Sequence, residues 1–172
     1  MSDRRDDVPQ VELRPFVPER DVPLVSVWLS RPHVARWWGN PERALSELSA
    51  HDANAVALIA VDDRPVGLVC WQTPSRSELE DAGLGDLPED LVDVDIMIGE
   101  QEALGRGVGP ATLLTLFAAL RESGVRLVGL AGAIENRRVR GAYARAGLRP
   151  HRDFTEGGEA YRYFTARLAE EA

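Results

Sequence analysis

The chain has 172 residues, of which 44% are hydrophobic and 28% are charged, and its formal net charge is −8. This length suits one domain, and the hydrophobic content is sufficient for a packed core. An acidic chain without a basic stripe argues against binding to nucleic acid. No apolar run approaches the ~20 residues that span a bilayer, so we also expect no membrane partner.

Residues 1–9 are predicted to be a disordered leader, and residues 10–172 a single domain. The charged N-terminus is unlike a signal peptide, so the expected location is the cytoplasm. The single cysteine, Cys70, excludes an internal disulfide, and no cysteine spacing of a metal site is present. Because Cys70 lies in the apolar run 66–71, we expect it to be a core side chain and not a nucleophile.

Hydrophobic periodicity and turn residues divide the first half of the chain into short elements. Strands are expected over 11–17, 55–61 and 65–73, with the last two forming a hairpin around Asp62-Asp63-Arg64. Helical segments are expected over 19–29, 34–38 and 41–50, and the last of these has a proline in its first turn. The first half is therefore predicted to be an antiparallel unit with helices inserted after its first strand.

The second half begins with a predicted irregular insertion over 74–91. Strands then follow over 92–99, 125–131, 148–155 and 159–168, and helices over 107–123 and 136–146. The expected fold class is a mixed α/β domain, with about seven strands in a mixed sheet and four or five flanking helices.

The segment Leu104–Gly109 has glycines at positions 105, 107 and 109, between a predicted strand and a predicted helix. Free amide groups at a helix start, together with the helix dipole, favour bound anions. The dipole contributes only about 0.3–1 kcal/mol, so several amides must act together. No Gly-Lys-Ser/Thr follows, and the spacing differs from a dinucleotide fingerprint. A phosphate or pyrophosphate seat and a plain glycine turn are the two interpretations.

A second motif follows the strand over 125–131. It has Asn136 at a helix start, Tyr143 seven residues later, and Gly147-Leu148 at the helix end. Together with the glycine loop, this order and spacing resemble the GNAT acetyltransferase superfamily. Two departures are Leu104, where many members have Gln or Arg, and Pro110, which has no amide hydrogen to donate.

The resemblance implies a GNAT fold and acetyl-CoA as the acyl donor, with no metal. It implies that the pyrophosphate is held at Gly105, Arg106, Gly107, Val108, Gly109 and Ala111. It further implies that Met97, Ile98 and Asn136 hold the pantetheine arm, and that Tyr143 protonates the leaving thiolate. A core-facing aromatic is the alternative role of Tyr143.

The segment Trp28–Gly39 resembles the early part of aminoglycoside 6'-N-acetyltransferases, and also that of siderophore-type N-acyltransferases of the same branch. Trp28 is expected in the core. Trp37 and Trp38 are adjacent and cannot both face one core, so one is expected to line a substrate cleft. His33 is either a ligand contact or a hydrogen-bonded residue that fixes the loop.

Alternation over 92–99 puts Asp93 and Asp95 on one strand face. By resemblance, Asp95 contacts the amine and acts as the base, directly or through water; an ordinary pKa of about 3.9 would make it a weak one. Residues 78–95 contain eight acidic residues without Lys or Arg, which would attract a polycation, and Glu80 is assigned to the substrate site. A solvated loop and strand face is the alternative interpretation.

The predicted reaction is direct transfer of an acetyl group from acetyl-CoA to a primary amine of a cationic small molecule, in a ternary complex. The 6'-amine of an aminoglycoside is the first candidate, and a siderophore-type or other small amine is the alternative. A coenzyme-A-binding domain without catalysis is the third. One departure from the aminoglycoside enzymes is Ala131, where related enzymes often have a second acid. The chain is expected to be a monomer or homodimer.

Overall fold

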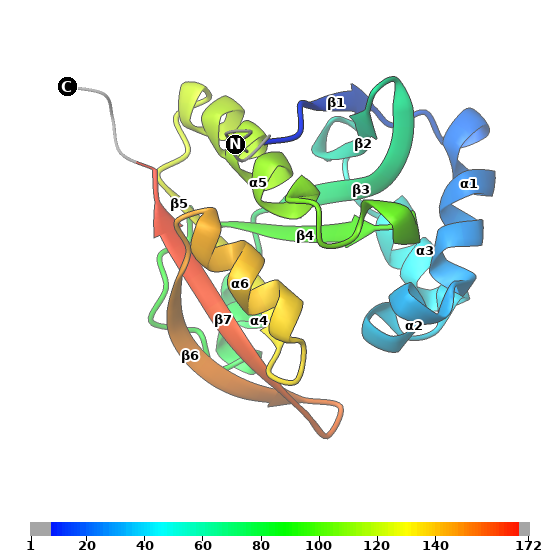
Figure 1. The fold of residues 1–172 in the computed structure, drawn as a ribbon. Helices are drawn as coiled ribbons and strands as arrows, with labels where there is room; N and C mark the ends of the chain where they lie inside the picture. Colours follow the sequence, from blue (N-terminus) through cyan, green and yellow to red (C-terminus); the bar gives the residue numbers. More distant parts are fainter. Residues whose placement is uncertain (1–7, 169–172) are drawn as a thin grey trace, which may run out of the picture.

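The computed structural model describes residues 8–168, and a seven-stranded sheet runs through its centre (Figure 1). The strand order is β1-β2-β3-β4-β5-β7-β6, and β4 and β5 are the one parallel pair among these strands. The predicted mixed sheet and antiparallel first half are thus confirmed. The strands are β1 (Val11–Pro15), β2 (Val56–Val61), β3 (Arg64–Gln72), β4 (Val92–Ile98), β5 (Leu127–Ala133), β6 (Arg149–Glu156) and β7 (Glu159–Arg167).

Six α-helices occur within residues 8–168, whereas the sequence predicted four or five. They are α1 (Pro18–Ser30), α2 (Pro32–Trp38), α3 (Pro41–Ser49), α4 (Arg76–Asp81), α5 (Val108–Glu122) and α6 (Arg137–Arg145). The additional helix is α4, so the prediction of an irregular 74–91 segment is wrong there. Ser75 Oγ accepts the Glu78 amide at 3.2 Å, and the Glu78 carboxylate accepts the Ser75 amide at 2.7 Å. This reciprocal cap stabilises a short helix despite the glycines and proline that follow it.

Helices cover both faces of the sheet. β4 contributes to two apolar clusters, and Leu91, directly before it, contributes to a third. Val92 and Val94 point into the cluster beneath α5 and α6, which lie in front of the sheet in Figure 1. On the opposite face, Met97 packs beneath α1–α3, and Leu91 packs with α4. Asp93 and Asp95 therefore lie between two helical groups on that face.

Cys70 is buried in the cluster beneath α1–α3, and burial raises the pKa of its thiol. The predicted core role is confirmed. Trp28 is also a core residue as predicted, with 0% of its surface exposed.

The predicted leader, residues 1–9, lies mostly outside the described residues. Of its last two residues, Val8 is exposed, and Pro9 packs beside Gly107. Within residues 8–168, no helix is both long and apolar enough to cross a membrane.

Candidate active site

The parallel strands β4 and β5 separate soon after they meet. Their pairing consists of Val92 with Val128 and Asp93 with Gly129, whereas β5 continues along β7 to Ala133. From Val94 onward, this edge of β4 has no partner among the described strands. An edge with unpaired amides and carbonyls can hold an extended ligand by hydrogen bonds.

Alternation decides which backbone groups face this open edge. The Gly99 amide donates to the Val66 carbonyl at 2.8 Å, so Gly99 faces β3. Since consecutive residues of a strand face opposite edges, Met97 also turns its backbone groups to β3, and Ile98 turns its own to the gap. Of the two predicted pantetheine contacts, Ile98 is therefore the better placed. Its carbonyl accepts a hydrogen bond from His33 Nε2 at 3.1 Å.

The glycine loop ends next to this gap and begins α5. Gly105 and Gly107 have φ of 70° and 78°, values that favour glycine, and Gly107 is the N-cap. Within the described residues, the amides of residues 105–109 donate to no other backbone group. The geometry therefore fits the phosphate seat and not merely a turn.

Ala111 differs from the other predicted phosphate contacts. Its amide donates to the Gly107 carbonyl at 3.2 Å, and the residue is 7% exposed. This amide already belongs to the helix ladder, so the predicted pyrophosphate contact of Ala111 is not supported. The available donors are those of the first turn, where no intrahelical acceptor exists.

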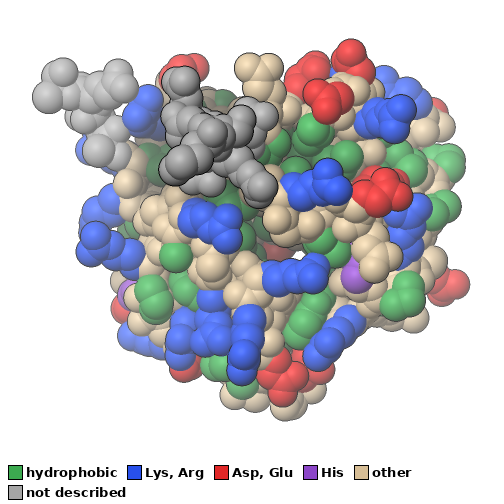
Figure 2. Space-filling model, in the orientation of Figure 1, with side chains coloured by type: hydrophobic (Ala, Val, Ile, Leu, Met, Phe, Trp, Pro, Cys, Tyr) green, Lys and Arg blue, Asp and Glu red, His purple; other side chains and the backbone are tan. Residues whose placement is uncertain are grey.

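Exposed arginines occur in the glycine loop and at the start of α6. Arg106, Arg137, Arg138 and Arg140 are exposed, and none forms an ion pair with another described residue. Figure 2 shows several arginine side chains (blue) on the face that α5 and α6 cover. The acidic chain thus has a locally basic surface, and such a surface suits an anionic ligand.

The two residues of the α6 motif have structural roles in the protein. Asn136 is the N-cap, and its Oδ1 accepts the Val139 amide at 3.4 Å. Tyr143 is 5% exposed, stacks edge-on against Phe164 at 5.3 Å, and donates its hydroxyl to the Ala131 carbonyl at 3.2 Å. Burial, followed by the charges of the β4 acids, raises the pKa of Tyr143, so its hydroxyl keeps its proton. Ala131 lies on β5, at the strand edge that faces the gap.

Asp93 and Asp95 lie together on β4, as alternation predicted. Asp95 is exposed, whereas Asp93 is half-buried and accepts the Tyr163 hydroxyl at 2.7 Å. Burial and then the Asp95 charge raise the pKa of Asp93 to about 8. The pKa of Asp95 is also raised, first by desolvation and then by the charges of Glu47 and Glu156, which oppose that of His51. The pair is therefore a stronger base than an ordinary aspartate.

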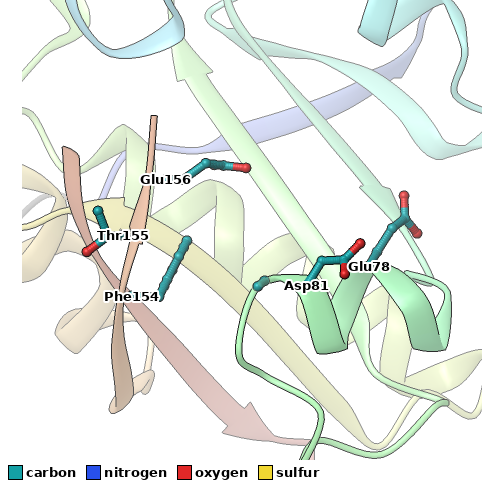
Figure 3. A pocket seen from close by; sticks show the side chains of 6 residues that line it. Glu78, Asp81, Phe154, Thr155 and Glu156 are labelled. Carbon is teal, nitrogen blue, oxygen red and sulfur yellow. The ribbon is translucent and has the colours of Figure 1, made fainter. Parts of the chain in front are cut away.

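A pocket of about 350 Å³ lies between α4 and the end of β6. Figure 3 shows Glu78 and Asp81 on one side and Phe154, Thr155 and Glu156 on the other. Two of its lining carboxylates act on the β4 acids: the charge of Glu78 raises the pKa of Asp93, and that of Glu156 raises the pKa of Asp95. Its acidic lining suits a cation.

Glu80, the predicted substrate contact, does not line this pocket. Positions 78, 81 and 82 share one face of α4, as residues three and four apart do. Glu80 lies on another side of the helix, beside Gly85. Asp86, another member of the acidic run, is paired with Arg152 at 2.9 Å. The eight acids therefore do not act as one surface.

Neither adjacent tryptophan of α2 lines the pocket beside α4. Trp38 packs against the cluster beneath α1–α3, and the Arg36 guanidinium lies 4.6 Å from the centre of the Trp37 ring. That one of them lines a substrate cleft stays a prediction. His33 has one of its two expected roles, because it forms a hydrogen bond to the Ile98 carbonyl.

Sequence reasoning missed the residues that join α1 and α2 to the end of β4. Glu100 accepts Trp28 Nε1 at 2.8 Å and Arg31 Nη1 at 2.7 Å, and Arg31 also donates to the Gly99 carbonyl. Gly99 lies against the Trp28 ring with no space for a Cβ atom. This network fixes the chain just before the glycine loop. The residues are about 70 positions apart, so no local pattern reveals it.

A family model for an acetyltransferase (GNAT) domain matches residues 17–155. The chain belongs to the GNAT acetyltransferase family. The matched segment includes β4, the glycine loop and the whole α6 motif, which confirms the resemblance drawn from these motifs. No curated protein matches the sequence.

Solved structures have the same GNAT fold. Aminoglycoside acetyltransferase AAC(6')-Ib in complex with coenzyme A and kanamycin has a TM-score of 0.75 and 19% identity, covering 92% of this chain and 95% of that chain. An aminoglycoside N(6')-acetyltransferase from Legionella pneumophila has a TM-score of 0.72 and 15% identity, covering 92% of each chain. An uncharacterized protein from Bacillus halodurans has a TM-score of 0.75 and 16% identity, covering 95% of this chain and 86% of that one.

Proposed function

We propose that this GNAT protein transfers an acetyl group from acetyl-CoA to a primary amine of a polycationic small molecule, with an aminoglycoside as the first candidate. The observation that carries this proposal is the separation of charge across the sheet. Arginines without ion-pair partners lie in the glycine loop and at the start of α6, and a carboxylate-lined pocket lies beside α4. An anionic donor and a cationic acceptor would thus meet at the gap between β4 and β5.

The donor side fits coenzyme A in three respects. The free amides of Gly105–Gly109 suit a pyrophosphate, and Arg106 supplies a positive charge beside them. The open edge of β4 at Ile98 suits an extended pantetheine arm. Asn136, at the start of α6, has a side-chain amide group that can donate to the same arm. AAC(6')-Ib, which has this fold, has been solved with coenzyme A.

The acceptor side fits an amine that enters from the pocket. In the proposed step the substrate ammonium gives one proton to Asp95, and the neutral nitrogen forms a bond to the thioester carbonyl carbon. The carbon–sulfur bond then breaks, and the leaving thiolate takes a proton from Tyr143. The nitrogen gives its second proton to restore the Tyr143 hydroxyl, and Asp95 releases the first proton to solvent. The products are an acetamide and free coenzyme A, and no other reactant is needed.

The proposal is tested by following free thiol release from acetyl-CoA with kanamycin, N-hydroxylysine and a polyamine. The expected result is release with kanamycin and with a polyamine that has several charges. Release with N-hydroxylysine alone would support the siderophore-type alternative. Coenzyme A binding without release with any amine would overturn the proposal in favour of a non-catalytic domain.

Removing two carboxylates of the pocket is expected to weaken polycation binding. Glu78→Gln with Asp81→Asn should raise the KM for kanamycin about tenfold or more, because each lost contact to a charged group costs about 1 kcal/mol or more. The value of kcat should change little. Gln at position 78 retains the capping box of α4.

Glu80→Gln is the matched control, since it removes a charge from the same helix away from the pocket. Its KM should stay within twofold of the original. Equal effects of the control and the double variant would mean that only the general field of the acidic segment attracts the substrate.

Tyr143→Phe is expected to lower kcat by about 10²-fold, because one positioned proton donor contributes about that much. The Kd for acetyl-CoA should change by less than threefold, since the aromatic ring and its packing on Phe164 remain. Rapid-quench kinetics and calorimetry measure the two quantities. An unchanged kcat would leave Tyr143 with its core role alone.

A further inference from the structure

Asp93 is held by a residue outside the GNAT motifs discussed above. The hydroxyl of Tyr163, on β7, donates to Asp93 Oδ1 at 2.7 Å. Tyr163 is 3% exposed and belongs to the apolar cluster beside α4. A short hydrogen bond from a buried phenol fixes the orientation of this carboxyl.

The strand between the two residues has a glycine at the point of contact, and its missing side chain permits the hydrogen bond. Gly129 of β5 is the register partner of Asp93, and β5 lies between β4 and β7. The Tyr163 ring and hydroxyl lie over Gly129, with no space for a Cβ atom. A side chain at position 129 would therefore separate Tyr163 from Asp93.

Asp93 and Asp95 project from the same face of β4, about 7 Å apart along the strand. The groups acting on Asp93 are Tyr163, Asp95 and Glu78 of α4. Those acting on Asp95 are His51 and Glu47 from the end of α3 and Glu156 from β6. Carboxyl groups outnumber the single histidine here, and both pKa values are raised. Because the charge of Asp95 raises the pKa of Asp93, the titrations of the two acids depend on each other.

We propose that Asp93 and Tyr163 are positioning residues for the base: Tyr163 fixes Asp93 beside Asp95, and the repulsion between the two carboxylates makes Asp95 a better acceptor for the proton of the substrate ammonium. The catalytic part of this inference rests on the proposed acetyl transfer. When Asp95 takes a proton, the ammonium becomes a neutral amine, and the pair loses one negative charge. Asp93 acts through Asp95 and does not touch the amine.

The two variants are expected to move the pH profile in the same direction, by different amounts. Asp93→Asn keeps the acceptor for Tyr163 but removes the charge beside Asp95, so the acidic limb of kcat/KM should move down by at least one pH unit. Tyr163→Phe removes the donor that stabilises ionised Asp93, so Asp93 is protonated over more of the pH range and the limb should move down by a smaller amount. Tyr161→Phe, on the same strand and bonded to Glu159, is the control and should leave the limb unchanged.

Carbon-13 NMR titration of aspartate-labelled protein without substrates tests the pair independently of catalysis. The original protein should show carboxyl steps above the ordinary aspartate range for both acids, and in Asp93→Asn the remaining step of Asp95 should move to lower pH. Independent, ordinary titration of both acids would overturn the proposal. Measurable acetyl transfer whose acidic limb of kcat/KM is moved by neither variant would also overturn it. If the two acids titrate as a pair but the protein acetylates no amine, the proposed acetyl transfer and the catalytic part of this inference are overturned. The pairing of Asp93 with Asp95 would then still stand. If Tyr163→Phe fails to fold, Asp93→Asn still decides both measurements.

Discussion

Asp95→Asn is expected to lower kcat/KM for the acetylated amine by ~10²–10⁴-fold, the usual effect of removing a general base. An asparagine has almost the same shape but cannot accept the ammonium proton, and it provides no negative charge to hold the substrate. Because the pKa of Asp95 is raised by desolvation, the original enzyme should lose activity as the pH falls through that value. The variant should lack this acidic limb.

The measurement is kcat/KM for kanamycin between about pH 5.5 and pH 9.5, with the acetyl-CoA Kd measured separately. The Kd should not change, because the glycine loop lies on another part of the site. Asp62→Asn, in the turn between β2 and β3, is a control that removes one carboxylate and tolerates the local φ of 49°. An Asp95→Asn enzyme with unchanged kcat/KM at every pH would show that Asp95 is neither base nor anchor.

Trp28→Ala is expected to reduce the free energy of unfolding by about 3–5 kcal/mol, the usual cost of removing a large buried aromatic side chain. Trp28 is fully buried, packs on Gly99 and donates to Glu100 at 2.8 Å. The variant leaves a cavity beneath α1 and removes one of the two donors to Glu100. Because the chain from Gly99 leads into the glycine loop, coenzyme A binding should weaken as well.

Urea denaturation measures this loss, and two variants separate its causes. Trp28→Phe fills much of the cavity but removes the indole donor, so its loss should be smaller, about 1.5–3 kcal/mol for a hydrogen bond to a charged group. Trp37→Ala, at a half-buried tryptophan of α2, should cost less than Trp28→Ala. Equal losses for the two alanine variants would contradict the central role given to Trp28.

The contrast between α5 and α4 shows what local sequence signals can and cannot predict. The glycines before α5 and the long apolar run within it predict a strand-to-helix junction, and the junction is present at Gly107. In α4 the signal is a six-residue capped turn, among glycines and a proline that indicate irregular backbone. A helix this short depends on its cap and on Leu79, which is buried among distant residues.

The family-level assignment was also within reach of the sequence. The glycine loop, Asn136 and Tyr143 act through backbone geometry and helix position, which their near neighbours specify. For this reason their order and spacing carry the resemblance to the GNAT superfamily, and that resemblance implies the fold and the acyl donor. The shared face of Asp93 and Asp95 follows from the same local rule, since alternate residues of a strand point the same way.

Only the tertiary structure decided which of these residues act together. Tyr163 donates to Asp93, which is 70 positions away in the sequence, past the missing side chain of Gly129. Trp28 donates to Glu100, which is 72 positions away. Glu78 lines the acidic pocket whereas Glu80 does not, because α4 is turned toward β6 by its packing. Such contacts depend on strand order and register, which are set only when the whole sheet assembles. A short stretch of sequence contains no information on them. The sequence alone therefore determined most of the elements, the motifs and the family. The assembled sheet determined the pair of acids Asp93 and Asp95, the pocket and the network that holds the glycine loop.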